Sequence, residues 1–194
     1  MTIAALLLFI RTLGLTLPLW IVAGWSAAEA AIFFIVADVP ISWIAVRSGT
    51  RAAMLAAIVA ALGSVAGTLA VLFWASHDPA GAAATMAALP GIDPALIAEA
   101  ASRYAQGFDA VLTGSFSGIP FKLFGLEAAR QGGILFLFLI LAPLLRLPRF
   151  LAVALFVGGV SHFLKRWMGM RQRLGLLLIL WTGFYAWYFS VMPS

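Results

Sequence analysis

The stretch GSFSGIPFKLFGLEAAR, residues 114–130, lies in a chain whose composition is otherwise that of a membrane protein. It places Gly114, Gly118, Pro120 and Lys122 in apolar surroundings. Glycine and proline interrupt a plain spanning helix, and a lysine facing lipid is unfavourable. The stretch therefore predicts irregular backbone inside the membrane, and the rest of the fold follows from that prediction.

The composition of the whole chain indicates an integral membrane protein. Of its 194 residues, 64% are hydrophobic and 10% are charged, whereas a soluble domain carries about 25% charged residues. We expect one integral membrane domain over residues 1–194. The absence of cysteine excludes disulfides, thiolate metal sites and cysteine catalysis. We expect no catalytic residue, no metal and no other cofactor. Basic residues gather at the ends of apolar segments, which favours membrane anchoring over nucleic-acid binding.

Two segments in the first half of the chain are long enough to be membrane helices. Residues 3–25 predict a first helix, and residues 52–75, which lack charged side chains, predict the clearest one. Gly63 and Gly67 form a GxxxG pair within the second segment. Such a pair favours close helix packing within the chain more than dimerisation. The sequence does not decide whether the protein forms a homo-oligomer.

Two further segments lie in the second half. Residues 132–164 are long enough for one helix, but a turn between two segments stays open because of Pro143, Arg146, Pro148 and Arg149. Residues 174–191 predict a C-terminal helix, with an interfacial aromatic belt at Trp181, Tyr185, Trp187 and Tyr188.

Residues 76–108 form the least apolar region and predict a loop outside the membrane. Its prolines and glycines mark turns. Asp93 followed by Pro94 predicts a helix cap, and residues 95–108 then predict a short amphipathic helix at the interface or over the protein surface.

The distribution of charge predicts the orientation. The loop at 165–173 is basic without acids and should be cytoplasmic, whereas the acidic region 76–108 should lie outside. A helix that starts near residue 132 must also start outside to reach that loop. Residues 109–131 therefore form a re-entrant hairpin, which is tolerated when buried in protein or lining a watery cavity. We expect a bacterial inner-membrane location.

A weak internal repeat supports a second hairpin. Pro120 lies 80 residues after Pro40, and the same offset sets Glu29 over Asp109. Each copy has an acid, then an apolar residue before proline, then a long apolar segment. An inverted repeat of this kind occurs in secondary transporters whose sites lie near the middle of the membrane.

The predicted fold is therefore an all-α polytopic membrane protein. It has two inverted hairpin–helix units, at 26–75 and 109–164, with additional N-terminal and C-terminal membrane helices.

The sequence IPFKLF at 119–124, followed by RLPRF at 146–150, resembles the DedA superfamily, also called the VTT or SNARE-associated family. The similarity is to its YqaA-like branch and covers residues 27–164. It implies two opposed re-entrant hairpins and the transport or scrambling of phospholipid or polyprenyl phosphate, with proton coupling in some members. The better-known branch has arginines at the places of Ser117 and Leu123, so those roles do not transfer.

The charged side chains in apolar segments are the candidate site. A charge at the bilayer centre costs about 2.5–3.5 kcal/mol, so these groups must pair, reach the interface or line a cavity. We expect an anionic lipid head group to bind Lys122, Arg146 and Arg149, with Glu29 and Asp38 as counter-charges or proton carriers. Secondary candidates are Asp109, Glu127 and Arg130, the last two favoured as a structural pair, and the predicted hairpin tips hold Pro40, Gly118 and Pro120.

Two other classes of function stay open. A non-transporting membrane scaffold would also suit the small residues and the amphipathic helix, but it should tolerate paired removal of Glu29 and Arg146. A membrane-embedded hydrolase using Ser115 or Ser117 with His162 is disfavoured, because no nucleophile motif surrounds either serine.

Overall fold

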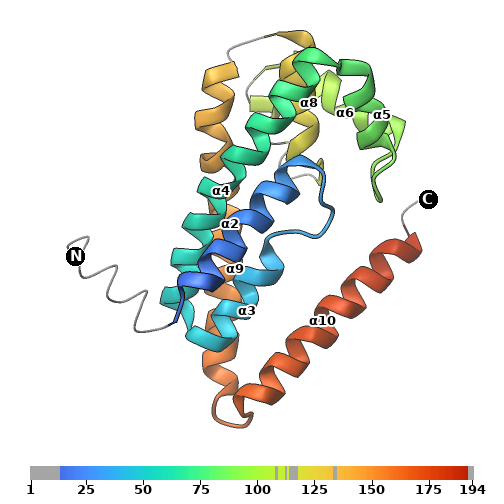
Figure 1. Cartoon of the computed structure of the whole chain (residues 1–194). Helices are drawn as coiled ribbons and strands as arrows, with labels where there is room; N and C mark the ends of the chain where they lie inside the picture. The colour runs from blue at the N-terminus through green and yellow to red at the C-terminus, as the bar shows by residue number, and fades with distance from the viewer. Residues whose placement is uncertain (1–13, 108, 112, 114–117, 133–134, 192–194) are drawn as a thin grey trace, which may run out of the picture.

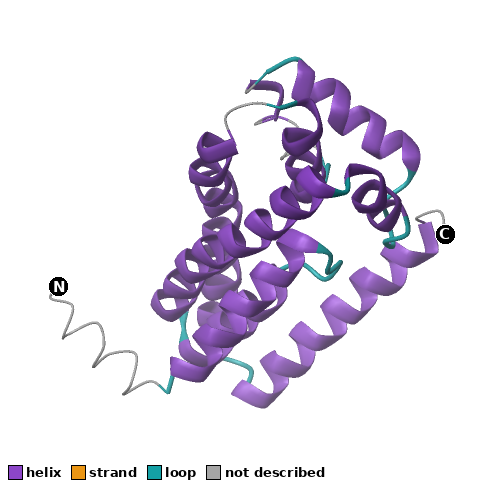
Figure 2. Cartoon of the chain, turned by 45° about the horizontal axis from the view of Figure 1, so that its top comes forward, coloured by secondary structure: helices purple, strands orange, loops and turns teal. Residues whose placement is uncertain are grey.

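The computed structural model describes residues 14–107, 109–111, 113, 118–132 and 135–191. Within these ranges the chain is helical and contains no strand, as predicted (Figure 2). The helices are α2 (Thr16–Ala31), α3 (Asp38–Ser48), α4 (Thr50–His77), α5 (Pro79–Ala87), α6 (Pro94–Ala105), α8 (Phe121–Gln131), α9 (Leu135–Leu164) and α10 (Met170–Val191). Three of them, α4, α9 from residue 139 onward and α10, are long and apolar enough to cross a bilayer.

Helices α4 and α9 form the centre of the molecule and run in opposite directions (Figure 1). Helix α4 forms because its sequence is rich in alanine and apolar residues and has no proline. Most of its alanines are buried in the packing of α4 with α2, α3 and α9, and Ala52, Ala56 and Ala60 have no exposed surface. These small side chains let the neighbouring backbones approach closely.

The GxxxG pair packs α4 against α2, as predicted for contacts within the chain. A Cβ atom on Gly63 would collide with the backbone of Ala23, and one on Gly67 with the carbonyl oxygen of Ala27. The two helices therefore lie in contact along their length and hold Glu29, near the end of α2, beside α4 and α9.

Two short helices precede the two central ones. Helices α3 and α8 each have 11 residues, and each ends at a glycine in the left-handed region: Gly49 with φ 89° and Gly132 with φ 73°. Glycine is favoured there because it lacks a Cβ atom. Helix α3 leads into α4 at one end of the molecule, and α8 lies near the start of α9 at the other (Figure 1).

The structure adds a second correspondence to the predicted repeat. The short helices and their terminal glycines correspond at an offset of 83 residues, whereas the predicted repeat has an offset of 80, because Asp38 begins α3 and Phe121 begins α8. Pro40 lies in the first turn of α3, whereas Pro120 is the N-cap of α8. The first turn tolerates proline because its N–H has no helical partner.

The polar region contains more helix than predicted. Asp93 accepts a hydrogen bond from the Leu96 backbone N–H at 2.6 Å, which confirms the predicted cap of α6. Helix α5 was expected as turns, but Asp78 caps it in the same way by accepting from the Gly81 backbone N–H at 2.8 Å. Proline follows the cap residue in both helices.

Several predicted boundaries differ from the structure. The prediction divides a first helix at residues 3–25 from a hairpin unit that begins at residue 26, but α2 is continuous across this boundary and begins at Thr16. Residues 3–13 of the predicted first helix lie outside the described residues. Helix α9 continues through Pro143 and Pro148, which excludes the turn. The predicted basic loop is shorter, because α10 already includes Arg173, whose buried side chain donates to the Ser161 carbonyl at 3.1 Å.

The glycine contacts of α4 generate a test of packing. Gly67→Ala should lower the free energy of unfolding by about 1–3 kcal/mol, because the new Cβ atom forces α2 away from α4. Gly159→Ala in α9 is the matched control, since open space surrounds that position; it should leave stability unchanged or raise it by up to about 1 kcal/mol. Thermal unfolding in detergent measures both, and equal stability of the two variants would contradict the α2–α4 packing.

Candidate functional site

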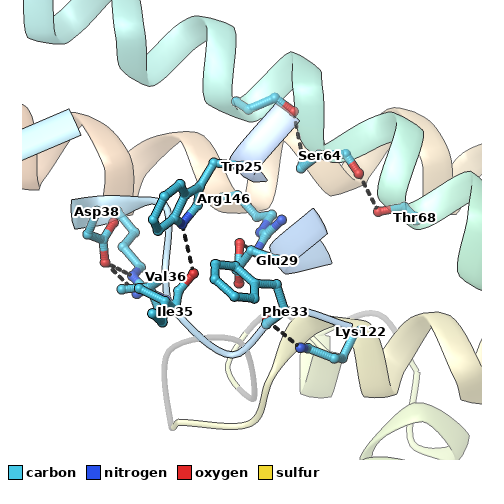
Figure 3. Close-up of polar contacts among 12 residues, drawn as sticks. Trp25, Glu29, Phe33, Ile35, Val36, Asp38, Ser64, Thr68, Lys122 and Arg146 are labelled. Carbon is cyan, nitrogen blue, oxygen red and sulfur yellow. Dashed lines mark hydrogen bonds and ion pairs between the residues drawn. The ribbon is translucent and has the colours of Figure 1, made fainter. Parts of the chain in front are cut away.

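The loop at residues 32–37, between α2 and α3, is held by side chains from three helices. Trp25 of α2 donates its indole N–H to the Ile35 carbonyl at 3.0 Å, and Lys122 of α8 donates to the Phe33 carbonyl at 2.8 Å (Figure 3). The Val36 backbone N–H donates to the Tyr185 hydroxyl of α10 at 2.9 Å. These bonds provide partners for backbone carbonyl and N–H groups of the loop that are not hydrogen-bonded within a helix.

Next to this loop, Glu29 of α2 pairs with Arg146 of α9. Both side chains are almost buried, with 12% and 9% of their surfaces exposed. The Arg146 guanidinium also lies over the rings of Phe121 and Phe150, at 5.8 and 5.5 Å from their centroids. Its charge is therefore compensated by a carboxylate and by two aromatic faces.

A second pair joins Asp38 to Arg149 three residues farther along α9. The Nε of Arg149 donates to the Asp38 carboxylate at 3.0 Å. Asp38 is buried, whereas 46% of the Arg149 side chain is exposed. Since residues three apart share a face of a helix, both arginines of α9 face α2 and the start of α3, where Glu29 and Asp38 lie.

Lys122 is the third cation of the cluster and lies on α8. The residue is only 6% exposed. Within the described ranges no carboxylate forms an ion pair with it, and the Phe33 carbonyl is its hydrogen-bond acceptor. The cluster of Glu29, Asp38, Lys122, Arg146 and Arg149, called the charge cluster below, thus has three cations and two acids.

Four residues of the charge cluster, all but Asp38, line a cavity of about 310 Å³. Its polar groups come from α2, α8, α9 and α10, and its remaining walls are mostly apolar and aromatic. The lining residues include Glu29, Phe34, Lys122, Arg146, Arg149 and Tyr185. A small cavity with apolar walls and a few converging polar groups is typical of a binding site.

Two polar atoms of the charge cluster lack a partner. In the part of the chain that the structure describes, Nη1 of Arg146 and Oδ1 of Asp38 are buried without a hydrogen bond. A buried donor without an acceptor costs about 1–3 kcal/mol. The Arg146 donor therefore favours a ligand that brings an acceptor, such as an anion.

The structure brings together the five principal site residues predicted from the sequence but separates the secondary ones. Glu127 is buried and pairs with Arg130 at 2.9 Å on α8, outside the cavity lining, which agrees with a structural pair. Asp109 is exposed and also lies outside the lining. Of the predicted tip residues, Gly118 and Pro120 line the cavity and Pro40 does not.

Sequence reasoning assigned the aromatic residues of α10 to an interfacial belt and missed their contacts with the site. Phe184, Tyr185 and Tyr188 line the cavity, and the Trp181 indole N–H donates to the Ser42 hydroxyl of α3 at 2.9 Å. The spacing of Trp181, Tyr185 and Tyr188 places them on one face of a helix, which was an available signal.

Comparison of this chain with protein-family models, with curated proteins and with solved structures finds no match.

The buried pair generates a double-substitution test. Arg146→Gln leaves Glu29 buried without its partner and should lower the free energy of unfolding by about 3–5 kcal/mol. The double variant Glu29→Gln/Arg146→Gln should recover most of that loss, because no buried charge is left unpaired. Arg103→Gln breaks an exposed pair with Glu99 and should change stability by less than about 1 kcal/mol. Additive losses in the double variant would contradict a direct interaction between Glu29 and Arg146.

Proposed function

We propose that this chain is a DedA-like membrane protein that moves an anionic lipid, phospholipid or polyprenyl phosphate, by binding its head group in the cavity. The observation that carries the proposal is the convergence of Lys122, Arg146 and Arg149 on one cavity with a surplus of positive charge. Arginine presents paired donors that match phosphate oxygens. The unpartnered donor of Arg146 supports an acceptor-rich ligand.

The lengths of the short helices support two re-entrant hairpins. With 11 residues each, α3 and α8 extend about 17 Å, whereas the hydrocarbon core is about 30 Å thick. Neither helix is long enough to cross the bilayer, and in the proposed arrangement α3 pairs with α2 to enter and leave on one face. Their positions at opposite ends of α4 and α9 support the inverted arrangement (Figure 1).

The charge distribution supports the sidedness. Lys165 and Arg166, between α9 and α10, lie on the cytoplasmic side, and the region 76–108 lies outside. We further propose a bacterial inner-membrane location. In this proposal the charge cluster lies at membrane depth between the two hairpins, where protein encloses Glu29, Asp38, Lys122 and Arg146 and Asp38 neutralises the half-exposed Arg149.

The size of the cavity indicates which part of the lipid it receives. Its volume of about 310 Å³ lies at the lower end of the range for ligand sites. It holds a phosphate-bearing head group while the acyl or prenyl chain stays in the bilayer. The exposed apolar surfaces of α9 and α10, including Phe156 and Leu178, are compatible with that lipid contact.

The two acids of the charge cluster compensate its arginines when the site is empty. Glu29 and Asp38 neutralise Arg146 and Arg149 when no ligand is bound. An arriving phosphate competes with these carboxylates for the arginines, because both present oxygen acceptors to the same fork of donors. In this proposal Glu29 and Asp38 are also the groups that carry a proton if lipid movement is coupled to protons.

Reconstituted vesicles test this function. The wild type should move labelled phospholipid or polyprenyl phosphate across the bilayer, and Arg146→Gln and Lys122→Gln should each lower the initial rate by about tenfold or more. The double variant Glu29→Gln/Arg146→Gln should also be slow although it restores stability. Arg103→Gln, on an exposed pair, is the control and should keep the wild-type rate.

Two other results would count against the proposed function. Lipid movement that is equal in wild type and cluster variants would make the charge cluster structural. A wild type that moves neither lipid above background would contradict the proposal and favour a scaffold.

Single-cysteine labelling tests the second hairpin. The chain contains no cysteine, so Asp109→Cys and Gln131→Cys each introduce one label at an exposed position. Both should react with an impermeant maleimide from the external face of right-side-out vesicles, because the hairpin begins and ends on that face. Reaction from opposite faces would mean that residues 109–131 cross the membrane.

A further inference from the structure

Helix α10 contributes to the cavity although it is the least buried of the three helices that are long and apolar enough to cross a bilayer. Half of the residues in the most apolar 18-residue stretch of α4 are buried, whereas none is buried in that of α10. It lies apart from the bundle and packs mainly against α3 (Figures 1 and 2). Yet Tyr185 and Tyr188 both line the cavity. A helix that served only as a membrane anchor has no need of polar groups at this position.

The hydroxyl of Tyr185 accepts a hydrogen bond in the structure but donates none among the described residues. Its oxygen accepts the hydrogen bond of the Val36 N–H at 2.9 Å. A phenolic hydroxyl also donates one hydrogen bond, and among the described residues no acceptor takes this proton. The side chain is half-buried and borders the cavity that Lys122 and Arg146 also line. An unused neutral donor thus faces the same space as two cations.

We infer that Tyr185 is a further ligand-binding residue, whose hydroxyl donates to an oxygen of the phosphate held by Lys122 and Arg146. This inference rests on the proposed function and makes α10 a part of the binding site. A phosphate group has several acceptor oxygens, and donors from α8, α9 and α10 approach it from three elements. The Val36 bond fixes the orientation of the hydroxyl while leaving its proton available.

A purely structural role for Tyr185 makes a different prediction, and Trp25 provides the comparison. Both rings make one hydrogen bond to the 32–37 loop, Tyr185 at Val36 and Trp25 at Ile35. Trp25 is outside the cavity lining. If holding the loop were the whole contribution of Tyr185, removal of either bond would weaken ligand binding equally.

The experiment compares Tyr185→Phe with Trp25→Phe, each in the full-length protein in detergent. Binding is measured by calorimetry with three probes: dihexanoyl phosphatidic acid, inorganic phosphate and dihexanoyl glycerol, which lacks phosphate. We expect Tyr185→Phe to weaken binding of the phosphatidic acid by about tenfold or more, as for a lost hydrogen bond to a charged group. Trp25→Phe should stay within about twofold of the wild type, since it leaves the phosphate donors in place.

The probes identify the source of the phosphate. Binding of the phosphatidic acid without binding of inorganic phosphate indicates a lipid head group, and equal loss of affinity for both in Tyr185→Phe indicates recognition of phosphate alone. Equal weakening by Tyr185→Phe and Trp25→Phe, or no weakening by Tyr185→Phe, would overturn the assignment of Tyr185 while leaving the proposed function intact. A wild type that binds neither phosphate probe, or binds the diglyceride as tightly, would overturn both.

Discussion

The structure depends on how the non-helical backbone at residues 32–37 is satisfied. Carbonyl and N–H groups at membrane depth need partners within the protein, because lipid supplies none. Three side chains provide them, and each comes from a different helix: Trp25 from α2, Lys122 from α8 and Tyr185 from α10. The loop therefore joins elements that are far apart in the sequence. The same requirement brings a cation and a hydroxyl to one place, and a cavity with binding groups results from satisfying the backbone.

Around this loop, the proposed chemistry follows from the balance of charge. Each arginine of α9 has one acid as its partner, Glu29 of α2 or Asp38 of α3, whereas Lys122 has only a carbonyl among the described residues. Paired charges are tolerated in a medium of low dielectric constant, and in the proposed function the surplus positive charge favours an anionic ligand. The charge cluster thus draws on α2, α3, α8 and α9 at once. The same arrangement explains why removal of one partner should affect stability, while removal of both should affect only function.

Sequence reasoning predicted the features that depend on local chemistry. The apolar α4, the cap at Asp93 and the glycine contacts of Gly67 each follow from side-chain type and spacing. The pairing of acids with arginines was predictable because unpaired charges are unfavourable in lipid. The 83-residue offset of the short helices and the contact of Tyr185 with the 32–37 loop were not predicted. Proline was taken to mark a tip, but it is equally tolerated in a first helical turn. Tyrosine near a helix end is ambiguous between an interface and a buried hydrogen bond until the loop that it contacts is placed.

The central claim is that the 32–37 loop lies at membrane depth, enclosed by the helices that bind it. Its most direct test is the collision rate of a nitroxide spin label at Ile32→Cys, an exposed position in the loop and outside the cavity lining, with oxygen and with a water-soluble nickel chelate in reconstituted vesicles. A label at Gln106→Cys, exposed after α6 in the polar region, is the reference. Our account predicts that the label at residue 32 collides mainly with oxygen and little with the nickel chelate, and that the reference shows the reverse. Equal access of the chelate to both labels would place the loop in water and contradict the account.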